Sequence, residues 1–376
     1  MISNLRTTER NSRIELLRII CMLMIVTYHY AIYGFYSQDL VYSPNKAFVE
    51  LLSLGGQFGV SVFVLISGYY MVDQKYSFRK FSVFLGQLWF YTLGSLLLFS
   101  TVFSSSGLVT REILSMSLLP ISKGHYWFAT SYFVLMLLSS YLNCFIKNAG
   151  RRQLLAAIAV LLLVYTLLPT LFDIYLSNGS TIARFITLYL SAGYIRLYGR
   201  EEGSGCRVHR RIFLCLLALS FAWVLLSNFL WQRFGLEFFL LHSNDLPQNG
   251  IFIYILPLEM FLCFLSFKPV YNKKINFLAS LAFGVYLFHD NQLIRSMWQG
   301  LFKTSQFALS PWLPVHALAA IVSVYLAGSL VELFRQKTFG LLWQCLTDSL
   351  LVPLWQRLCR CFTSALCIKD AVEKNK

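Results

Sequence analysis

The sequence predicts an all-α fold, a polytopic membrane bundle of about ten transmembrane helices with both termini in the cytoplasm. Three observations lead to this prediction. Of the 376 residues, 57% are hydrophobic and only 13% are charged, a composition unlike that of soluble globular proteins. The apolar residues form repeated runs of about 18 to 24 residues, the length that crosses a bilayer as a helix. The basic residues are also distributed unevenly among the segments that connect these runs.

Ten apolar runs are long enough to be membrane spans. They lie at about 14–35, 51–72, 82–103, 126–146, 153–172, 182–199, 212–231, 250–267, 276–297 and 312–334. The first run follows three arginines and does not end in the small residues of a cleavage site. We therefore expect it to be a retained helix rather than a signal peptide.

The positions of the basic residues predict the orientation. Of the 32 Lys and Arg residues, 25 fall on the N-terminal segment, the C-terminal tail and alternate loops, and 7 fall on the other loops. Basic residues collect on the cytoplasmic side of membrane proteins, so both termini are predicted to be cytoplasmic. The net charge of +15 then reflects membrane orientation, and we expect no nucleic-acid partner. All nine cysteines fall in predicted spans or on the inner side, which argues against an external disulfide framework.

The chain divides into three predicted parts. Residues 1–13 form a short basic cytoplasmic arm, residues 14–335 form the ten-span domain, and residues 336–376 form a cytoplasmic tail. The tail contains the apolar stretches LLWQCL and LLVPLWQRL next to basic residues. This pattern is typical of an amphipathic helix on the inner leaflet. Asp348 and Pro353 interrupt the stretch, so we do not expect an eleventh span.

The first span carries three ionisable residues, Glu15, Arg18 and His29. Such groups are costly inside a membrane helix and are functional candidates by default. Arg18 and His29 are eleven residues apart, which is about 20° past three full turns and about 16 Å of helix rise. Both side chains therefore project from one face of the helix. Glu15 precedes Arg18 by three residues, the spacing at which helix side chains meet, and is expected to orient the guanidinium.

Two other ionisable positions are expected to be structural. Glu259 lies in the middle of the eighth span, where we expect it to face the bundle interior. Glu332 and Arg335 close the tenth span, and their spacing predicts an ion pair.

Arg18, the ten residues after it and His29 resemble the signature of the acyltransferase-3 family. Three further stretches look similar to family motifs: FGVSVFVLISGYYM at 58–71, GHYWFATSYFVLMLLS at 124–139 and SLAFGVYLFHD at 280–290. Two positions depart from the pattern. The family often has a proline after the histidine of the last motif, where this chain has Asp290, and it usually has paired arginines where this chain has Arg79-Lys80.

The resemblance implies an integral membrane enzyme of the bacterial inner membrane that transfers an acyl group, usually acetyl, to a hydroxyl of a surface glycan or a lipid-linked sugar. It implies acetyl-CoA as the donor. Acyl transfer needs a base for the hydroxyl proton, and His29 is the only histidine predicted deep in the bilayer. The expected catalytic residues are His29, Arg18 and Glu15.

The other candidate residues lie near the two membrane surfaces. Arginine pairs with phosphate through two hydrogen bonds, so Arg18, Arg79 and Lys80 are expected to bind the donor on the inner side. His125, Trp127 and His289 lie at predicted outer ends of spans, at positions that match family motifs, and are expected to line the acceptor site. Direct transfer and an acyl group held on His29 are both compatible with this pattern.

Two other functions fit a membrane bundle: a lipid-linked glycan flippase or transporter, and a membrane polysaccharide polymerase. Transporters often have inverted repeats or pairs of broken helices, and neither is visible here. A polymerase is expected to have a large outer loop, whereas the longest predicted outer loop has about 20 residues. The sequence has no phosphate-binding loop, nucleophile elbow or zinc-ligand spacing, so we expect no metal.

Overall fold

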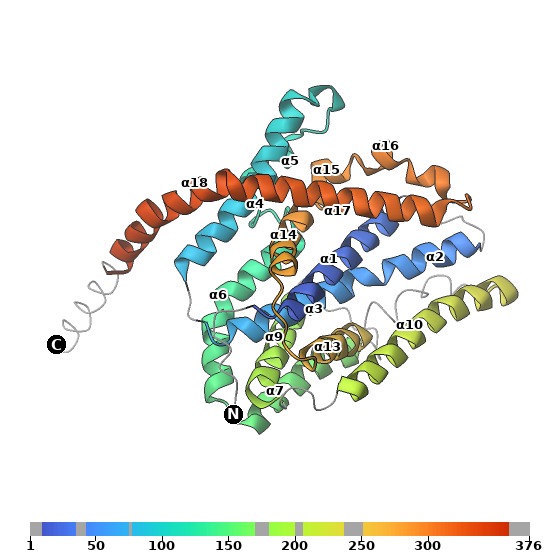
Figure 1. Ribbon diagram of the computed structural model, residues 1–376, viewed down its shortest axis with the longest axis horizontal. Helices are drawn as coiled ribbons and strands as arrows, with labels where there is room; N and C mark the ends of the chain where they lie inside the picture. Colours follow the sequence, from blue (N-terminus) through green and yellow to red (C-terminus); the bar gives the residue numbers. More distant parts are fainter. Residues whose placement is uncertain are drawn as a thin grey trace.

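The computed structural model describes residues 10–34, 43–74, 77–169, 180–199, 206–236 and 251–360, and these ranges contain helices and no strand (Figure 1). The longer helices are α1 (Ser12–Tyr33), α2 (Pro44–Ser53), α3 (Gly55–Met71), α4 (Phe78–Thr101), α5 (Arg111–Leu118), α6 (Trp127–Asn148), α7 (Arg151–Leu162), α9 (Ser180–Tyr198), α10 (Cys206–Phe234), α13 (Phe252–Leu265), α14 (Lys273–His289), α17 (Leu313–Lys337) and α18 (Phe339–Leu346). The shorter ones are η1 (Ser104–Ser106), η2 (Leu163–Leu167), α15 (Gln292–Arg295), α16 (Trp298–Phe302), η3 (Thr304–Phe307) and η4 (Thr347–Leu351). Most of the predicted basic arm and the last part of the predicted tail lie outside the described residues.

Six helical segments of the described chain are long and apolar enough to cross a membrane. They are Ser12–Tyr33, Pro44–Met71, Phe78–Thr101, Trp127–Asn148, Arg207–Phe234 and Leu313–Lys337. The all-α membrane bundle predicted from the sequence is thus supported by six candidate spans. The predicted spans at 153–172, 182–199, 250–267 and 276–297 contain α7, α9, α13 and α14, which do not meet the same criteria of length and apolarity. The count of ten spans and the positions of the termini remain predictions.

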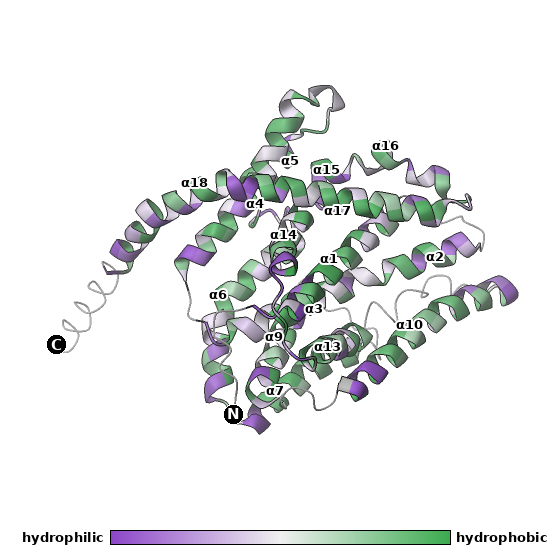
Figure 2. Ribbon diagram, in the orientation of Figure 1, coloured by the Kyte–Doolittle hydropathy of each residue, from purple (hydrophilic) through white to green (hydrophobic). Residues whose placement is uncertain are grey.

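One face of α17 carries a continuous apolar stripe on the surface. Val315, Leu318, Val322, Leu326, Leu330 and Phe334 are all exposed large hydrophobic residues. They recur every three or four residues, so they share one side of the helix. In Figure 2 the hydrophobic colour runs along this helix and its neighbours, and hydrophilic residues gather near helix ends. A surface of this kind is stable against lipid and costly in water.

Helix α1 lies at the centre of the bundle, where it contacts α3, α13, α14 and α17. Close packing on α3 depends on small residues, because a β-carbon at Gly59 would lie 2.8 Å from the carbonyl oxygen of Cys21. Small residues of this kind let membrane helices approach closely. The Ser12 hydroxyl donates a hydrogen bond of 2.7 Å to the side-chain oxygen of Asn276 at the start of α14. The starts of α1 and α14 therefore lie together, and so do their ends, as described below, so the two helices run parallel.

Two segments differ from their sequence prediction. The segment between the first two predicted spans, residues 36–50, contains the start of α2. Pro44 is the first residue of this helix. The hydroxyl of Ser43, just before it, accepts a hydrogen bond from the Lys46 backbone N–H at 3.2 Å. This is ordinary N-terminal capping chemistry. In the tail, the helix continues past Asp348 and Pro353 through the π-helical turn η4. Proline cannot donate its backbone hydrogen bond, and a wider turn accommodates this loss without ending the helix.

The tail helix packs lengthwise against the first half of α4. The Trp343 indole donates to the Ser82 carbonyl at 2.9 Å, and the Ser82 and Thr347 hydroxyls lie 2.9 Å apart. Further along, the Phe78 and Trp355 rings stack with centroids 4.8 Å apart. The tail is thus attached to the bundle along its length by both polar and aromatic contacts.

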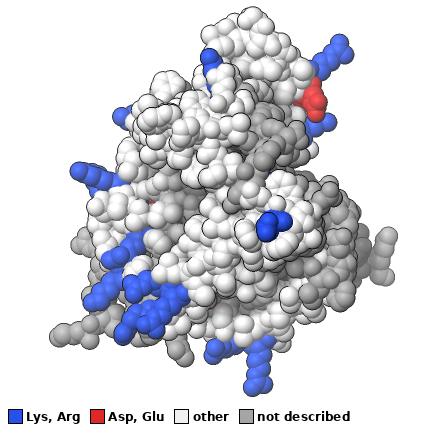
Figure 3. All heavy atoms as spheres, turned by 90° about the vertical axis from the view of Figure 1, so that its right-hand side faces the viewer, with Lys and Arg blue, Asp and Glu red and all other residues white. Residues whose placement is uncertain are grey.

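Basic side chains are prominent at the surface. On the face shown in Figure 3, Lys and Arg outnumber Asp and Glu, in keeping with 32 basic and 17 acidic residues in the whole chain.

Candidate active site

Two histidines that are far apart in the sequence meet at the ends of α1 and α14. His29 lies one turn before the end of α1, and His289 is the last residue of α14. Their Nδ1 and Nε2 atoms, respectively, lie 2.7 Å apart, and both side chains are buried. The sequence assigned His29 to the catalytic step and His289 to the acceptor site, and the structure brings them into direct contact.

The hydrogen bonds around the pair define which nitrogen carries each proton. His289 Nδ1 lies 2.6 Å from the carbonyl oxygen of Val285, which only accepts, so Nδ1 is the protonated nitrogen of His289. For a neutral ring, His289 Nε2 is then an acceptor, and His29 Nδ1 donates to it. The remaining nitrogen of His29, Nε2, carries a free lone pair. The chain Val285–His289–His29 therefore presents Nε2 of His29 as a proton acceptor.

A carboxylate lies on the accepting side of His29. Asp290 is buried, and its Oδ1 lies 3.9 Å from His29 Nε2. The Tyr33 hydroxyl donates to the same oxygen at 2.9 Å, and the Tyr33 ring stacks on the His29 ring with centroids 4.9 Å apart. Arg295 Nη1 donates to the Tyr33 hydroxyl at 3.0 Å and lies 3.7 Å from Asp290 Oδ1. In the sequence Asp290 appeared only as a departure from a family motif, and Arg295 and Tyr33 were not selected as site residues.

His125 joins the same end of the bundle from the segment before α6. It is only 4% exposed, and neither of its ring nitrogens has a hydrogen-bond partner within the described structure. Burial lowers the pKa of His125 to about 4, with smaller opposing effects of Asp290 and Arg295. A neutral imidazole with one free donor and one free acceptor is suited to binding a hydroxyl group.

The neighbouring tyrosine attaches this segment to α14. The Tyr126 hydroxyl donates to the Leu287 carbonyl at 2.8 Å and accepts from the Asn291 amide at 2.9 Å. Trp127, the third predicted acceptor residue, is 38% exposed and packs edge-on against Phe128. The described contacts do not join it to the histidine pair.

The predicted donor residues lie in two separate places. Arg18 Nε and Glu15 Oε2 lie 3.8 Å apart, and each of these buried atoms has no hydrogen-bond partner in the described part of the chain. Their proximity agrees with the helical spacing. Arg79 is exposed at the start of α4, and its guanidinium makes two hydrogen bonds to Asp348, at 2.7 and 3.0 Å. Lys80 donates to the Gln74 side chain. Neither residue contacts Arg18 in the described contacts.

The residues expected to be structural lie in polar networks, and Glu332 and Arg335 are buried. Glu332 accepts two hydrogen bonds from Arg335, at 2.8 and 2.7 Å, so the predicted ion pair is confirmed. It also accepts from the Tyr91 hydroxyl at 2.8 Å. Glu259 pairs with His209 of α10 at 2.7 Å.

Sequence reasoning overlooked His316, which accepts from the Tyr30 hydroxyl at 2.8 Å and donates to the Phe302 carbonyl at 2.8 Å. The first bond joins α17 to α1 at the residue after His29, and the second joins α17 to α16. Within the described residues, no group of three or more His, Cys, Asp and Glu side chains is arranged to hold a metal ion.

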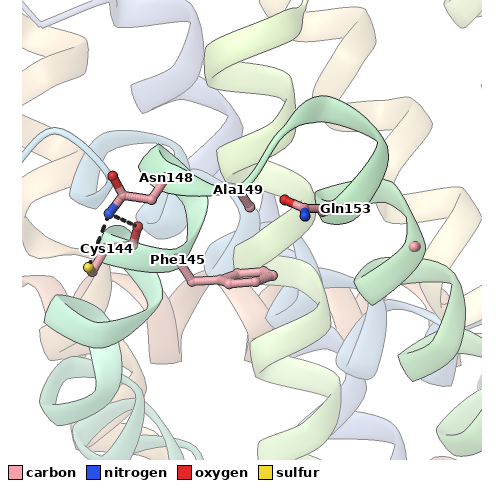
Figure 4. Close-up of a pocket in the computed structure, with 6 residues that line it drawn as sticks. Cys144, Phe145, Asn148, Ala149 and Gln153 are labelled. Atoms are coloured by element: carbon pink, nitrogen blue, oxygen red, sulfur yellow. Dashed lines mark hydrogen bonds between the residues drawn. The ribbon is translucent and has the colours of Figure 1, made fainter.

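A surface hollow lies between the end of α6 and the start of α7, lined by Cys144, Phe145, Asn148, Ala149, Gln153 and Ala156 (Figure 4). The Asn148 amide bonds to the Cys144 carbonyl at 2.9 Å within the same helix. Cys144 is 17 residues beyond the start of α6, about 25 Å along the helix from the His125 segment. This hollow is therefore separate from the histidine pair.

The comparison with known families identifies the chain. The acyltransferase-3 family model, described as an acyltransferase domain, matches residues 11–332. No curated protein and no solved structure matches the chain. The matched region covers most of the chain, from the start of α1 to Glu332 in α17, and includes both histidines of the pair. The chain belongs to the acyltransferase-3 family and is a membrane acyltransferase.

Proposed function

We propose that this protein transfers an acyl group, acetyl, from acetyl-CoA to a hydroxyl of a surface glycan or lipid-linked sugar, and that His29 is the general base. The observation that carries the proposal is the chain of hydrogen bonds from Val285 through His289 to His29. It leaves His29 Nε2 ready to accept a proton in a buried site, which is the chemical requirement for activating a sugar hydroxyl.

In the proposed reaction, the acceptor hydroxyl gives its proton to His29 Nε2 as its oxygen forms a bond to the acyl carbon. The carbon–sulfur bond of the thioester then breaks, and the proton on Nε2 passes to the departing sulfur. His289 holds the His29 ring in the required tautomer through both proton transfers. His289 thereby has a positioning role in addition to the acceptor-site role that the sequence suggested.

Arg18 is the proposed donor-binding residue. Its Nε is buried without a hydrogen-bond partner in the described structure, and a phosphate oxygen is a strong partner for such a group. Arg18 and His29 are separated by about 16 Å of helix rise, which suits a donor whose phosphates and thioester lie far apart. Arg79 and Lys80, at the start of α4, would also bind the phosphates of the donor. For this, Arg79 would exchange its hydrogen bonds to Asp348 for hydrogen bonds to phosphate.

His125 is the proposed acceptor-binding residue at the opposite end of α1. Its two buried and unpartnered nitrogens provide a donor and an acceptor for sugar hydroxyls, and Trp127 would add an aromatic surface beside it. The parallel arrangement of α1 and α14 supports donor entry from the end where both helices start, because both starts carry basic residues that favour the cytoplasm. The acceptor then enters from the other side, in the inner membrane of a bacterial cell.

The deciding experiment compares O-acetyl groups on surface glycans in a deletion strain that carries wild-type protein, His29→Ala or His209→Ala. The wild type and His209→Ala are expected to restore acetylation, because His209 pairs with Glu259 and is not a proposed site residue. His29→Ala is expected to reduce it by about 10²- to 10⁴-fold, the usual contribution of a general base. Full acetylation by His29→Ala at equal protein abundance would refute the role of His29. Unchanged glycan acetylation in the deletion strain would refute the proposed reaction itself.

A further inference from the structure

Asp290 lies beside the free nitrogen of His29. It follows the last residue of α14 directly, and its backbone N–H completes that helix by donating to the Tyr286 carbonyl at 3.0 Å. Its side chain then extends to the free nitrogen of His29, with 3.9 Å between Oδ1 and Nε2. This distance exceeds a hydrogen bond, so the carboxylate does not occupy the lone pair that the base needs.

Two side chains hold the carboxylate in this position. The Tyr33 hydroxyl donates to Asp290 Oδ1 at 2.9 Å, and Arg295 Nη1 lies 3.7 Å from the same oxygen. Tyr33 is one turn after His29 on α1 and stacks on its ring. Tyr33 thus contacts both the proposed base and the carboxylate.

We infer that Asp290 is a positioning residue of the acyl transfer, which stabilises the positive charge that develops on His29. The inference rests on the proposed function of His29. When the acceptor O–H bond breaks and the proton binds Nε2, the neutral imidazole becomes an imidazolium. At that moment a carboxylate 3.9 Å away is attracted to it, whereas the same carboxylate gains nothing from the neutral ring. The stabilisation therefore acts on the transition state more than on the bound substrates.

Burial makes this contribution large. Asp290 is 4% exposed and His29 is 4% exposed, so little water screens the two groups from each other. Asp290 neither takes the proton nor touches the transferred acyl group in this scheme. After the carbon–sulfur bond breaks, the proton moves from Nε2 to sulfur, and the charge pair disappears.

The test uses purified full-length protein in lipid vesicles, with acetyl-CoA as donor and glycan extracted from the deletion strain as acceptor. Asp290→Asn keeps the shape and the hydrogen bond from Tyr33 but removes the charge. We expect its kcat to fall about 10- to 100-fold, as for other residues that act through a functional side chain, with KM for both substrates within about threefold of wild type. Asp290→Glu restores a carboxylate and is expected to regain part of this loss.

A wild-type kcat for Asp290→Asn would overturn the inference, and so would a change confined to KM, which would indicate acceptor binding. A failure of Asp290→Glu to exceed Asp290→Asn would also count against it. Where Asp290→Asn does not fold, Tyr33→Phe provides the second measurement. This variant removes the hydroxyl that holds the carboxylate but leaves both charges in place, and its kcat is expected to fall between those of wild type and His29→Ala. A wild-type kcat for Tyr33→Phe would then reject the inference. His29→Ala is measured in parallel: if it retains activity, the proposed base is wrong, whatever Asp290 does.

Discussion

His29 Nδ1 and His289 Nε2 lie 2.7 Å apart and share a hydrogen bond. The other nitrogen of His289, Nδ1, donates to the Val285 carbonyl. A residue at position 289 must therefore accept a hydrogen bond to keep His29 in its active tautomer. Glutamine has a side-chain oxygen that accepts, whereas alanine has none. We expect His289→Ala to reduce kcat by about 10²-fold or more, and His289→Gln to retain at least about tenfold more activity than His289→Ala.

Acetyl transfer by the purified variants, with protein abundance and thermal unfolding measured beside it, checks this expectation. Equal activity of the two variants would show that the hydrogen bond to position 289 does not control the tautomer.

Arg18→Lys keeps the positive charge but loses the planar fork that binds phosphate. We expect the KM for acetyl-CoA to rise about tenfold or more, equal to the loss of one charge-assisted hydrogen bond, with a smaller effect on unfolding. Arg13→Lys is the matched control, because Arg13 lies on the same helix and is already bound to the Lys268 carbonyl at 2.7 Å. If both variants show an unchanged KM, Arg18 does not bind the donor phosphates.

Gly284 tests the packing of α14 on α17. A β-carbon there would lie 2.4 Å from Glu332 Cγ, so Gly284→Ala forces the buried Glu332–Arg335 pair to move. We expect it to destabilise the protein by about 1–3 kcal/mol. Gly94→Ala in α4 is the control, since nothing lies within 4 Å of its added carbon, and alanine favours helix by up to about 1 kcal/mol. The measurement is thermal unfolding of both variants in detergent. Equal unfolding midpoints for Gly284→Ala and Gly94→Ala would contradict the close packing of α14 on α17.

The attachment of the tail to α4 is expected to depend on pH. The hydrogen bonds from Arg79 hold the pKa of Asp348 below its usual value. A carboxylate with a lowered pKa in the folded state contributes stability above its unfolded pKa of about 4, and this contribution disappears as the pH falls through the folded pKa. Cysteines at Ser82 and Thr347, whose oxygens lie 2.9 Å apart, are expected to form a disulfide at neutral pH. Adding Asp348→Asn should lower the yield at neutral pH, and an unchanged yield would show that the ion pair does not hold the tail.

Sidedness of the site is tested with single cysteines in a background that lacks the native nine. His125 is buried, so its exposed neighbour Lys123 is the better position for labelling from the predicted outer side. Lys80, also exposed, represents the predicted inner side. We expect an impermeant thiol reagent to label the two positions from opposite faces of the membrane, with protection by acetyl-CoA at position 80 alone. Labelling of both from one face would overturn the ten-span topology.

The sequence was sufficient to predict features that depend on a single segment of the chain. The first span was expected at 14–35 and the last at 312–334, and α1 and α17 occupy Ser12–Tyr33 and Leu313–Lys337. Apolar runs and flanking charges determine such helices locally. The pairing of Glu332 with Arg335 was predicted for the same reason, because both lie on one helix.

The site depends on how the helices pack against one another, and the sequence did not predict these contacts. The contact of His29 with His289 requires a particular rotation of α14 against α1, which periodicity alone does not specify. The same is true of Asp348, whose partner Arg79 lies 269 residues earlier. Pro353 was expected to interrupt the tail, but the π-helical turn before it keeps the helix intact.

The contact between the two histidines also sets an order of events during synthesis. Some 260 residues separate them, which a ribosome adds in roughly 13 to 52 s at about 5–20 residues per second. During that interval His29 of the nascent first helix does not yet have its hydrogen-bond partner His289. The histidine pair forms only after residue 289 of the 376 has been synthesised, so a chain that ends before this residue is expected to insert its early helices and to lack acyl transfer.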